Sequence, residues 1–192
     1  MEKKKVIYFG DIQKYFKVIE DLQDTFSWEY VLLINNNTLF SDSNLKNKSL
    51  DVESLENPKF IYDKNNSLPP LNLKILNSLS RFENIFLSIL KDSSGWNFSF
   101  NERKNFYYHT LKYWKKILDN KKPDIIIFLT KPTTAISYAL YIICKFYLKI
   151  NVMISSPIFL YDKVFLTYSN SLEESNPLIN KNYEENHNEI SN

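Results

Sequence analysis

The stretch Lys-Pro-Asp-Ile-Ile-Ile-Phe-Leu at residues 122–129 is the part of this 192-residue sequence that decides the fold. Residues 124–129 are almost continuously apolar and rich in β-branched side chains, which is typical of a strand buried on both faces of a parallel sheet. Lys122 and Pro123 close the helix expected before it, because proline disfavours helix in the residue that precedes it. We therefore predict that residues 124–129 form a central strand.

The segments on either side of this strand repeat a strand–helix–strand pattern. Downstream, a turn at 130–134 leads to an apolar helix at 135–148 and a strand at 150–154. Near the N-terminus, a strand at 5–9 ends at Gly10, Asp11 caps a helix whose apolar residues have helical spacing, and a second strand follows at 29–34. Two β-α-β units predict an α/β fold: a three-layer, Rossmann-like domain with a mainly parallel sheet of about five strands.

The rest of the chain completes this domain. We predict a strand at 59–62, a helix at 71–91, and a helix from residue 100 onward that a capping box of Ser99 and Glu102 opens. The domain is expected to span residues 1–168. Residues 169–192 are polar and acidic and are predicted to form a disordered tail.

Composition excludes several classes of enzyme. The chain has 2 glycines, so neither a Walker A loop nor a Gly-x-Gly-x-x-Gly dinucleotide motif can be built. One cysteine rules out an intramolecular disulfide and a multi-cysteine metal centre, and 2 histidines make a histidine-rich metal site improbable. We accordingly predict no cofactor and no metal.

Charge is unevenly distributed along the chain. Residues 99–149 contain ten lysines and arginines against three acidic residues, although the whole chain has a net charge of +2. Such a basic segment suits a phosphorylated ligand, a nucleic acid or an anionic membrane surface, and it also fits an ordinary solvated surface. Lysine outnumbers arginine 22 to 2, which favours the solvated surface, because arginine is the better phosphate and base reader. Nucleic acid rests on this basic segment alone and ranks last. The N-terminus lacks a signal-peptide pattern, so we predict a cytoplasmic protein and leave association with a membrane open.

Ligands of doubly wound sheets bind at the carboxyl ends of the strands, near the point where the strand order reverses. Small, hydroxylated and charged residues gather at the predicted strand ends in this sequence. Turns and helix caps prefer the same residue types, so a structural role is the alternative at each position. The candidate ligand-binding residues are Gly10, Asp11, Lys131, Thr133, Thr134, Ser155 and Ser156.

Three segments together resemble a known family. The lead-in and strand at 122–127, the helix after it, and the strand at 150–154 followed by Ser-Ser-Pro-Ile resemble the N-terminal half of bacterial capsular and surface polysaccharide glycosyltransferases of the GT-B type. The strand at 6–9 with Gly10 and a following helix also fits. The resemblance covers roughly residues 4–168 and implies a domain that binds the acceptor, a saccharide or a lipid-linked saccharide.

In that family a second domain binds the nucleotide-sugar donor, and we expect these 192 residues to lack that domain. The resemblance therefore implies the acceptor-side domain of a glycosyltransferase-like protein, inactive alone, whose partner is a second domain or subunit. A truncated reading frame, a split subunit and a relative without catalysis are all compatible with this expectation. The alternative function is a non-catalytic binding or protein-interaction module that uses the same fold.

Overall fold

The protein is described from a computed structural model. The parts of the chain that it describes are residues 3–35, 48–52, 55, 70–93, 98–155, 158–160, 163–165, 167–168 and 176–177.

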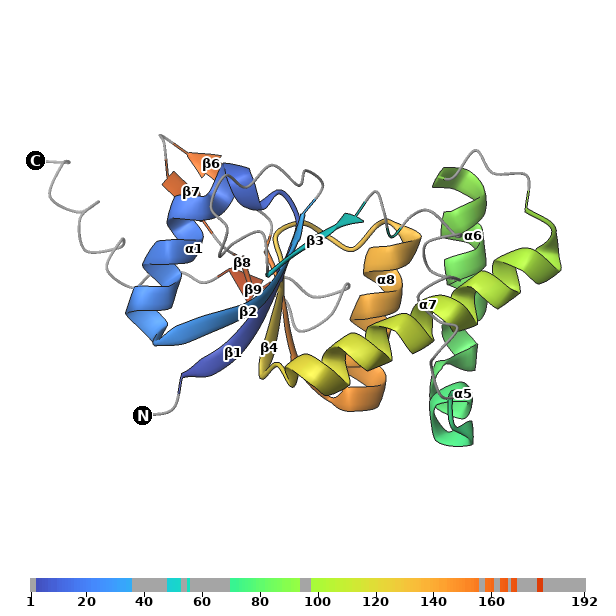
Figure 1. Cartoon of the computed structure of the whole chain (residues 1–192). Coiled ribbons are helices and arrows are strands. Elements are labelled where there is room, and N and C mark those ends of the chain that lie inside the picture. The colour runs from blue at the N-terminus through green and yellow to red at the C-terminus, as the bar shows by residue number, and fades with distance from the viewer. Residues whose placement is uncertain are drawn as a thin grey trace, which may run out of the picture.

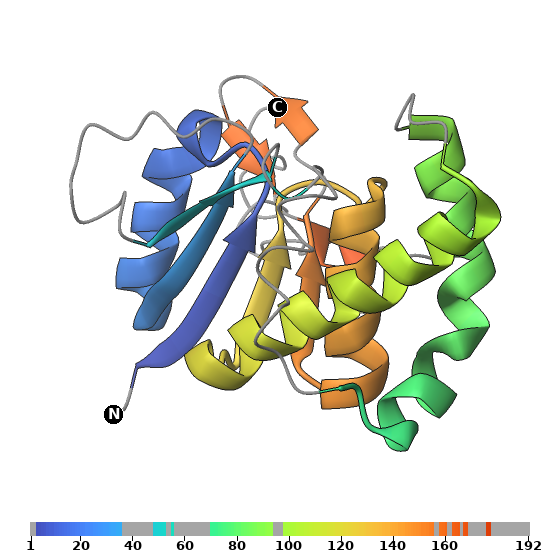
Figure 2. The same cartoon turned by 45° about the vertical axis from the view of Figure 1, so that its right-hand side comes forward.

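One sheet of five parallel strands forms the centre of the molecule. Its strand order is β3-β2-β1-β4-β5, and the arrows of the sheet point the same way in Figure 2. The strands are β1 (Lys4–Phe9), β2 (Trp28–Asn35), β3 (Ser49–Asp51), β4 (Ile125–Phe128) and β5 (Asn151–Ile154). This confirms the predicted α/β fold with a parallel sheet of about five strands.

Helices cover both faces of this sheet (Figure 1). Helix α1 (Ile12–Phe26) lies on one face, and the remaining helices form a thicker layer on the other. That layer contains α5 (Leu73–Leu79), the 3₁₀ turn η1 (Ser80–Phe82), α6 (Glu83–Ser93), α7 (Phe100–Lys121), α8 (Ala135–Ile142) and the π-helical turn η2 (Ile143–Leu148). Two short antiparallel pairs join β6 (Ile158–Leu160) to β7 (Lys163–Phe165) and β8 (Thr167–Tyr168) to β9 (Asn176–Pro177).

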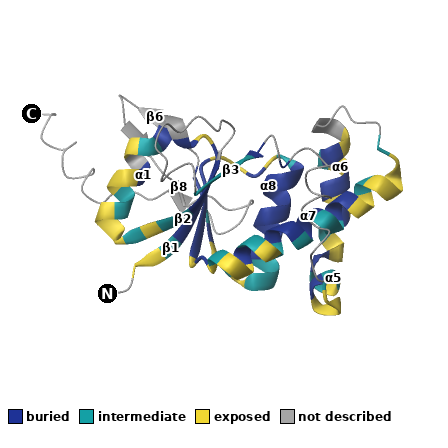
Figure 3. Ribbon diagram, viewed as in Figure 1, coloured by how far each residue is buried: buried dark blue, intermediate teal, exposed yellow. Residues whose placement is uncertain are grey.

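Strand β4 is buried on both faces, as its sequence predicts. Ile126 and Phe128 face the thick helical layer, whereas Ile125 and Ile127 belong to the cluster around α1. All four residues of β4 are at most 6% exposed. Figure 3 shows the same burial along α8, which is apolar nearly all round and packs between the sheet and α6 and α7.

Helix α7 begins and ends as the sequence predicts. The Ser99 hydroxyl accepts a hydrogen bond from the Glu102 amide (3.3 Å), and the Glu102 carboxylate accepts one from the Ser99 amide (2.8 Å). The Ser99 hydroxyl also donates a hydrogen bond to the Glu102 carboxylate (2.8 Å), and this bond, followed by the one from the Ser99 amide, holds the pKa of Glu102 below its usual value. At the other end Lys122 adopts the left-handed conformation with φ 46°.

Because a β-carbon is strained at positive φ, glycine is the residue that best closes a helix in this way. We expect Lys122→Gly to raise the free energy of unfolding by about 0.5–1 kcal/mol, since it relieves that strain. Lys116→Gly, in the exposed interior of the same helix, is the matched control and should lower it by about 1 kcal/mol. Urea unfolding of both variants measures the difference, and destabilisation by Lys122→Gly would contradict the assigned backbone conformation.

The sheet contains one strand that the sequence analysis did not predict, and two predicted segments lie wholly or mostly outside the described residues. The outer strand next to β2 is β3 at Ser49–Asp51, which the sequence did not indicate, and the strand expected at 59–62 lies outside the described residues. Of the predicted tail at 169–192, only Asn176 and Pro177 are described, as strand β9.

Within the described part of the chain, none of the helices is long and apolar enough to cross a membrane.

Candidate functional site

The carboxyl ends of β1 and β4 border a cleft with a volume of about 390 Å³. These two strands are adjacent in the sheet, yet the chain leaves β1 toward β2 on one side and leaves β4 toward β5 on the other. The cleft therefore lies at the point where the strand order reverses, which is where doubly wound sheets bind their ligands. It is lined by Phe9, Gly10, Asp11, Val52, Thr130, Lys131, Pro132, Thr133, Thr134 and Ser137.

The cleft combines an apolar floor with a polar rim. Phe9 and Val52 are 7% and 5% exposed and belong to the core beneath it. The side chains of Asp11, Lys131 and Thr133 are exposed around it, together with Thr130. A carboxylate, an ammonium group and two hydroxyls supply both donors and acceptors. A concave, partly apolar hollow with a few polar groups and this volume suits a small polar ligand.

Gly10 shapes the cleft and leaves its own amide engaged in the sheet. Its amide donates a hydrogen bond to the Ile34 carbonyl (2.9 Å). Its φ is +140°, and a β-carbon at this position would lie 2.8 Å from the Leu129 Cβ. Only glycine fits such a backbone conformation beside so close a neighbour. The lack of a side chain at Gly10 therefore leaves room in the cleft where β1 ends. Because its amide already bonds to Ile34, we assign Gly10 no hydrogen bond from its amide to a ligand.

Thr134 has a structural role that accounts for most of its hydrogen bonds. As N-cap of α8, its hydroxyl accepts a hydrogen bond from the Ser137 amide (3.3 Å) and lies 3.0 Å from the Ser137 hydroxyl. The Ser137 hydroxyl in turn accepts a hydrogen bond from the Thr134 amide (3.1 Å). The two residues form a capping box that fixes where α8 begins at the edge of the cleft.

Ser155, the described one of the two predicted serines, does not line this cleft. Ser155 follows β5, and its amide donates to the Phe128 carbonyl (2.7 Å). Its side chain is 3% exposed and is not among the residues that line the cleft. Val152 and Ile154 face the thick helical layer, so the alternation along the strand turns Ser155 toward the α1 face. Ser156 lies outside the described residues.

Five of the seven predicted residues thus line one cleft: Gly10, Asp11, Lys131, Thr133 and Thr134. Sequence reasoning missed Val52, because the short strand before it carries no strong strand signal. It also missed Ser137, whose position three residues after Thr134 is the capping-box spacing and could have identified it.

The chemistry available to the described lining is limited. Asp11 and Lys131 are its titratable residues, and His109, the histidine within the described helices, lies on α7 and does not border the cleft. Burial and the nearby Lys112 ammonium lower the pKa of His109. Among the described residues no group of three or more His, Cys, Asp or Glu side chains could hold a metal ion.

Comparison of the chain with known protein families, with curated proteins and with solved structures finds no match.

Proposed function

We propose that the chain is the acceptor-side domain of a glycosyltransferase-like protein of cell-surface polysaccharide synthesis, and that its cleft binds a saccharide. The position of the cleft at the β1–β4 switch point carries this proposal. The exposed hydroxyl, carboxylate and ammonium groups of its rim suit the vicinal hydroxyls of a sugar, which donate and accept hydrogen bonds at once. Phe9 and Val52 offer an apolar floor against which the C–H face of a sugar ring packs.

The same lining favours binding over catalysis by this domain alone. Glycosyl transfer needs a donor diphosphate neutralised by cations or helix amides and an acceptor hydroxyl placed in line with it. In the described lining Lys131 is the cation and Asp11 the carboxylate. This single ammonium and single carboxylate would have to neutralise the donor diphosphate and also position the acceptor hydroxyl. We propose that a second domain or subunit holds the donor opposite this cleft.

The affinities of the isolated chain test this proposal. We expect saccharides to bind with dissociation constants of roughly millimolar, about 4 kcal/mol, and nucleotide sugars no more tightly. Lys131→Ala should weaken saccharide binding about 3- to 10-fold, because it removes one hydrogen-bonding cation from the rim. Lys17→Ala, on the exposed side of α1, is the matched control and should leave the affinity unchanged.

Isothermal calorimetry with methyl glycosides and with nucleotide sugars measures these affinities, and a radiolabelled donor assay measures transfer. We expect no transfer. Micromolar binding of a nucleotide sugar that Lys131→Ala abolishes would overturn the proposal and make this cleft a donor site. Absence of saccharide binding together with capture of a protein at the cleft would favour the alternative, a non-catalytic interaction module.

A further inference from the structure

Helices α5 and α6, joined by η1, lie at the edge of the molecule away from the sheet (Figure 3), and exposed residues recur along both of them. Their buried residues, among them Ile75, Leu79, Phe86 and Leu90, face α7, α8 and η2. The exposed residues recur at helical spacing on the opposite side. We call this face the outer stripe, and its residues are Leu73, Lys74, Asn77, Ser80, Arg81, Asn84, Ile85, Ser88 and Lys91.

The outer stripe is cationic and partly apolar. It contains two lysines and one arginine and no carboxylate. Leu73 is 75% exposed and Ile85 is 50% exposed, which places both among the most exposed large apolar side chains described. Charge is concentrated in this part of the chain: residues 70–122 contain ten lysines and arginines against four acidic residues, a net charge of +6 compared with +2 for the whole chain.

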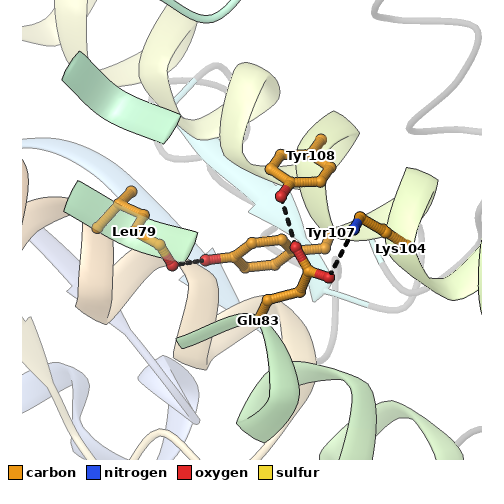
Figure 4. A network of polar contacts seen from close by, with 5 residues as sticks. All are labelled: Leu79, Glu83, Lys104, Tyr107 and Tyr108. Atoms are coloured by element: carbon orange, nitrogen blue, oxygen red, sulfur yellow. Dashed lines mark hydrogen bonds and ion pairs between the residues drawn. The ribbon is translucent and has the colours of Figure 1, made fainter. Parts of the chain in front are cut away.

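The acidic residue at the start of α6 is turned away from the outer stripe. Glu83 accepts a hydrogen bond from the Tyr108 hydroxyl (2.5 Å) and pairs with the Lys104 ammonium (3.3 Å), as Figure 4 shows. The Tyr107 hydroxyl donates to the Leu79 carbonyl (2.6 Å). These contacts connect α5 and α6 to α7. Because the Lys104 ammonium neutralises the Glu83 carboxylate, Glu83 does not offset the positive charge of the outer stripe.

A basic hollow lies between α7 and the residues that precede α5. Pro70 and Leu71 border it together with three lysines of α7, and its volume is about 150 Å³. Of these lysines, Lys115 pairs with Asp119 (2.5 Å), whereas Lys112 and Lys116 leave a net positive charge. A second group of lysines therefore lies beside the segment that leads into α5.

We infer that the outer stripe docks the protein on the surface of a bilayer that contains anionic lipids. Leu73 and Ile85 insert at the level of the headgroups, and Lys74 and Lys91 contact the lipid phosphates and carboxylates. The Arg81 guanidinium lies over the Phe82 and Phe146 rings, 4.6 and 5.1 Å from their centroids, and adds positive charge from there. An exposed helical face with both apolar and basic residues binds membranes by burying apolar side chains and by electrostatic attraction to anionic lipids. A nucleic acid would use the positive charge but would leave Leu73 and Ile85 in water. This inference does not depend on the ligand of the cleft.

Cosedimentation of the full chain with lipid vesicles tests the inference. We expect binding to phosphatidylcholine vesicles that contain about 30% phosphatidylserine, weakened by salt, and little binding to phosphatidylcholine alone. Lys74→Glu with Lys91→Glu should reduce the partition coefficient about 25-fold or more, since each basic residue near an anionic surface contributes about fivefold. Leu73→Ser should weaken binding without changing its dependence on salt.

Lys4→Glu with Lys17→Glu is the matched control, because both lysines are exposed, lie on β1 and α1 rather than on α5 or α6, and give the same change in net charge. It should retain most of the binding. Circular dichroism confirms that each variant is folded. Equal losses in the two double variants would overturn the inference, because net charge alone would then explain binding. Equal binding to neutral vesicles, or retention of a single-stranded RNA oligonucleotide without retention of anionic vesicles, would overturn it too.

Discussion

Ile126→Asp is expected to leave no folded protein. Ile126 is 0% exposed in the centre of the sheet, with β1 and β5 on either side of its strand. A carboxylate there would have no described cation within the core to pair with. Burying an unpaired charge costs at least several kcal/mol, which is comparable with the whole stability of about 5–15 kcal/mol of a protein domain.

The measurement is far-UV circular dichroism and thermal unfolding of purified Ile126→Asp. Ile85→Asp is the matched control, because the same substitution falls on a side chain that is 50% exposed. We expect the control to unfold cooperatively with a loss of about 1 kcal/mol or less. A soluble and cooperatively folded Ile126→Asp protein would contradict the assignment of β4 as the central strand.

Gly10→Ala is expected to have the second-largest effect. The backbone at Gly10 has a φ of +140°, which side chains rarely tolerate, and the new Cβ would lie 2.8 Å from the Leu129 Cβ. Leu129 is itself held in place, because its amide donates to the Phe9 carbonyl (2.8 Å). Backbone strain and overpacking together should lower the free energy of unfolding by about 2–5 kcal/mol.

Urea unfolding measures this loss. Lys131→Ala, an exposed substitution on the same cleft, serves as control and should change stability by no more than about 0.5 kcal/mol. Gly10→Ala should also impair the cleft, because β1 or β4 must shift to accommodate the methyl group. If Gly10→Ala is as stable as the parent protein, the close approach of β1 and β4 at this edge is wrong.

Most of the fold could be predicted because its signals are local. The apolar run before Leu129 is too continuous for a strand with a solvated face, and the Ser99–Glu102 spacing marks a helix start by itself. Strand β3 escaped prediction because its three residues, Ser49–Asp51, include one apolar side chain. Its place in the sheet comes from pairing with β2, a long-range contact that no local pattern encodes.

The candidate site could be predicted to a smaller extent, because residue type does not distinguish a ligand contact from a cap. Thr133 and Thr134 are adjacent and identical in chemistry, yet one is exposed on the rim and the other caps α8. Ser155 follows a strand end as expected, but the alternation along β5 turns it away from the cleft. Which face a residue occupies depends on register, and register becomes visible only in the folded sheet.

The central claim is that saccharides bind in the cleft between the ends of β1 and β4. The most direct test is an ¹⁵N–¹H correlation spectrum of the full chain during titration with methyl hexosides and a methyl uronide. We expect fast-exchange shifts with roughly millimolar affinity, confined to the amides of Gly10, Asp11, Lys131 and Thr133 and their neighbours, and absent from the same titration of Lys131→Ala with Asp11→Asn. Shifts that gather on another face of the molecule, or spectra unchanged at saturating sugar, would contradict the account.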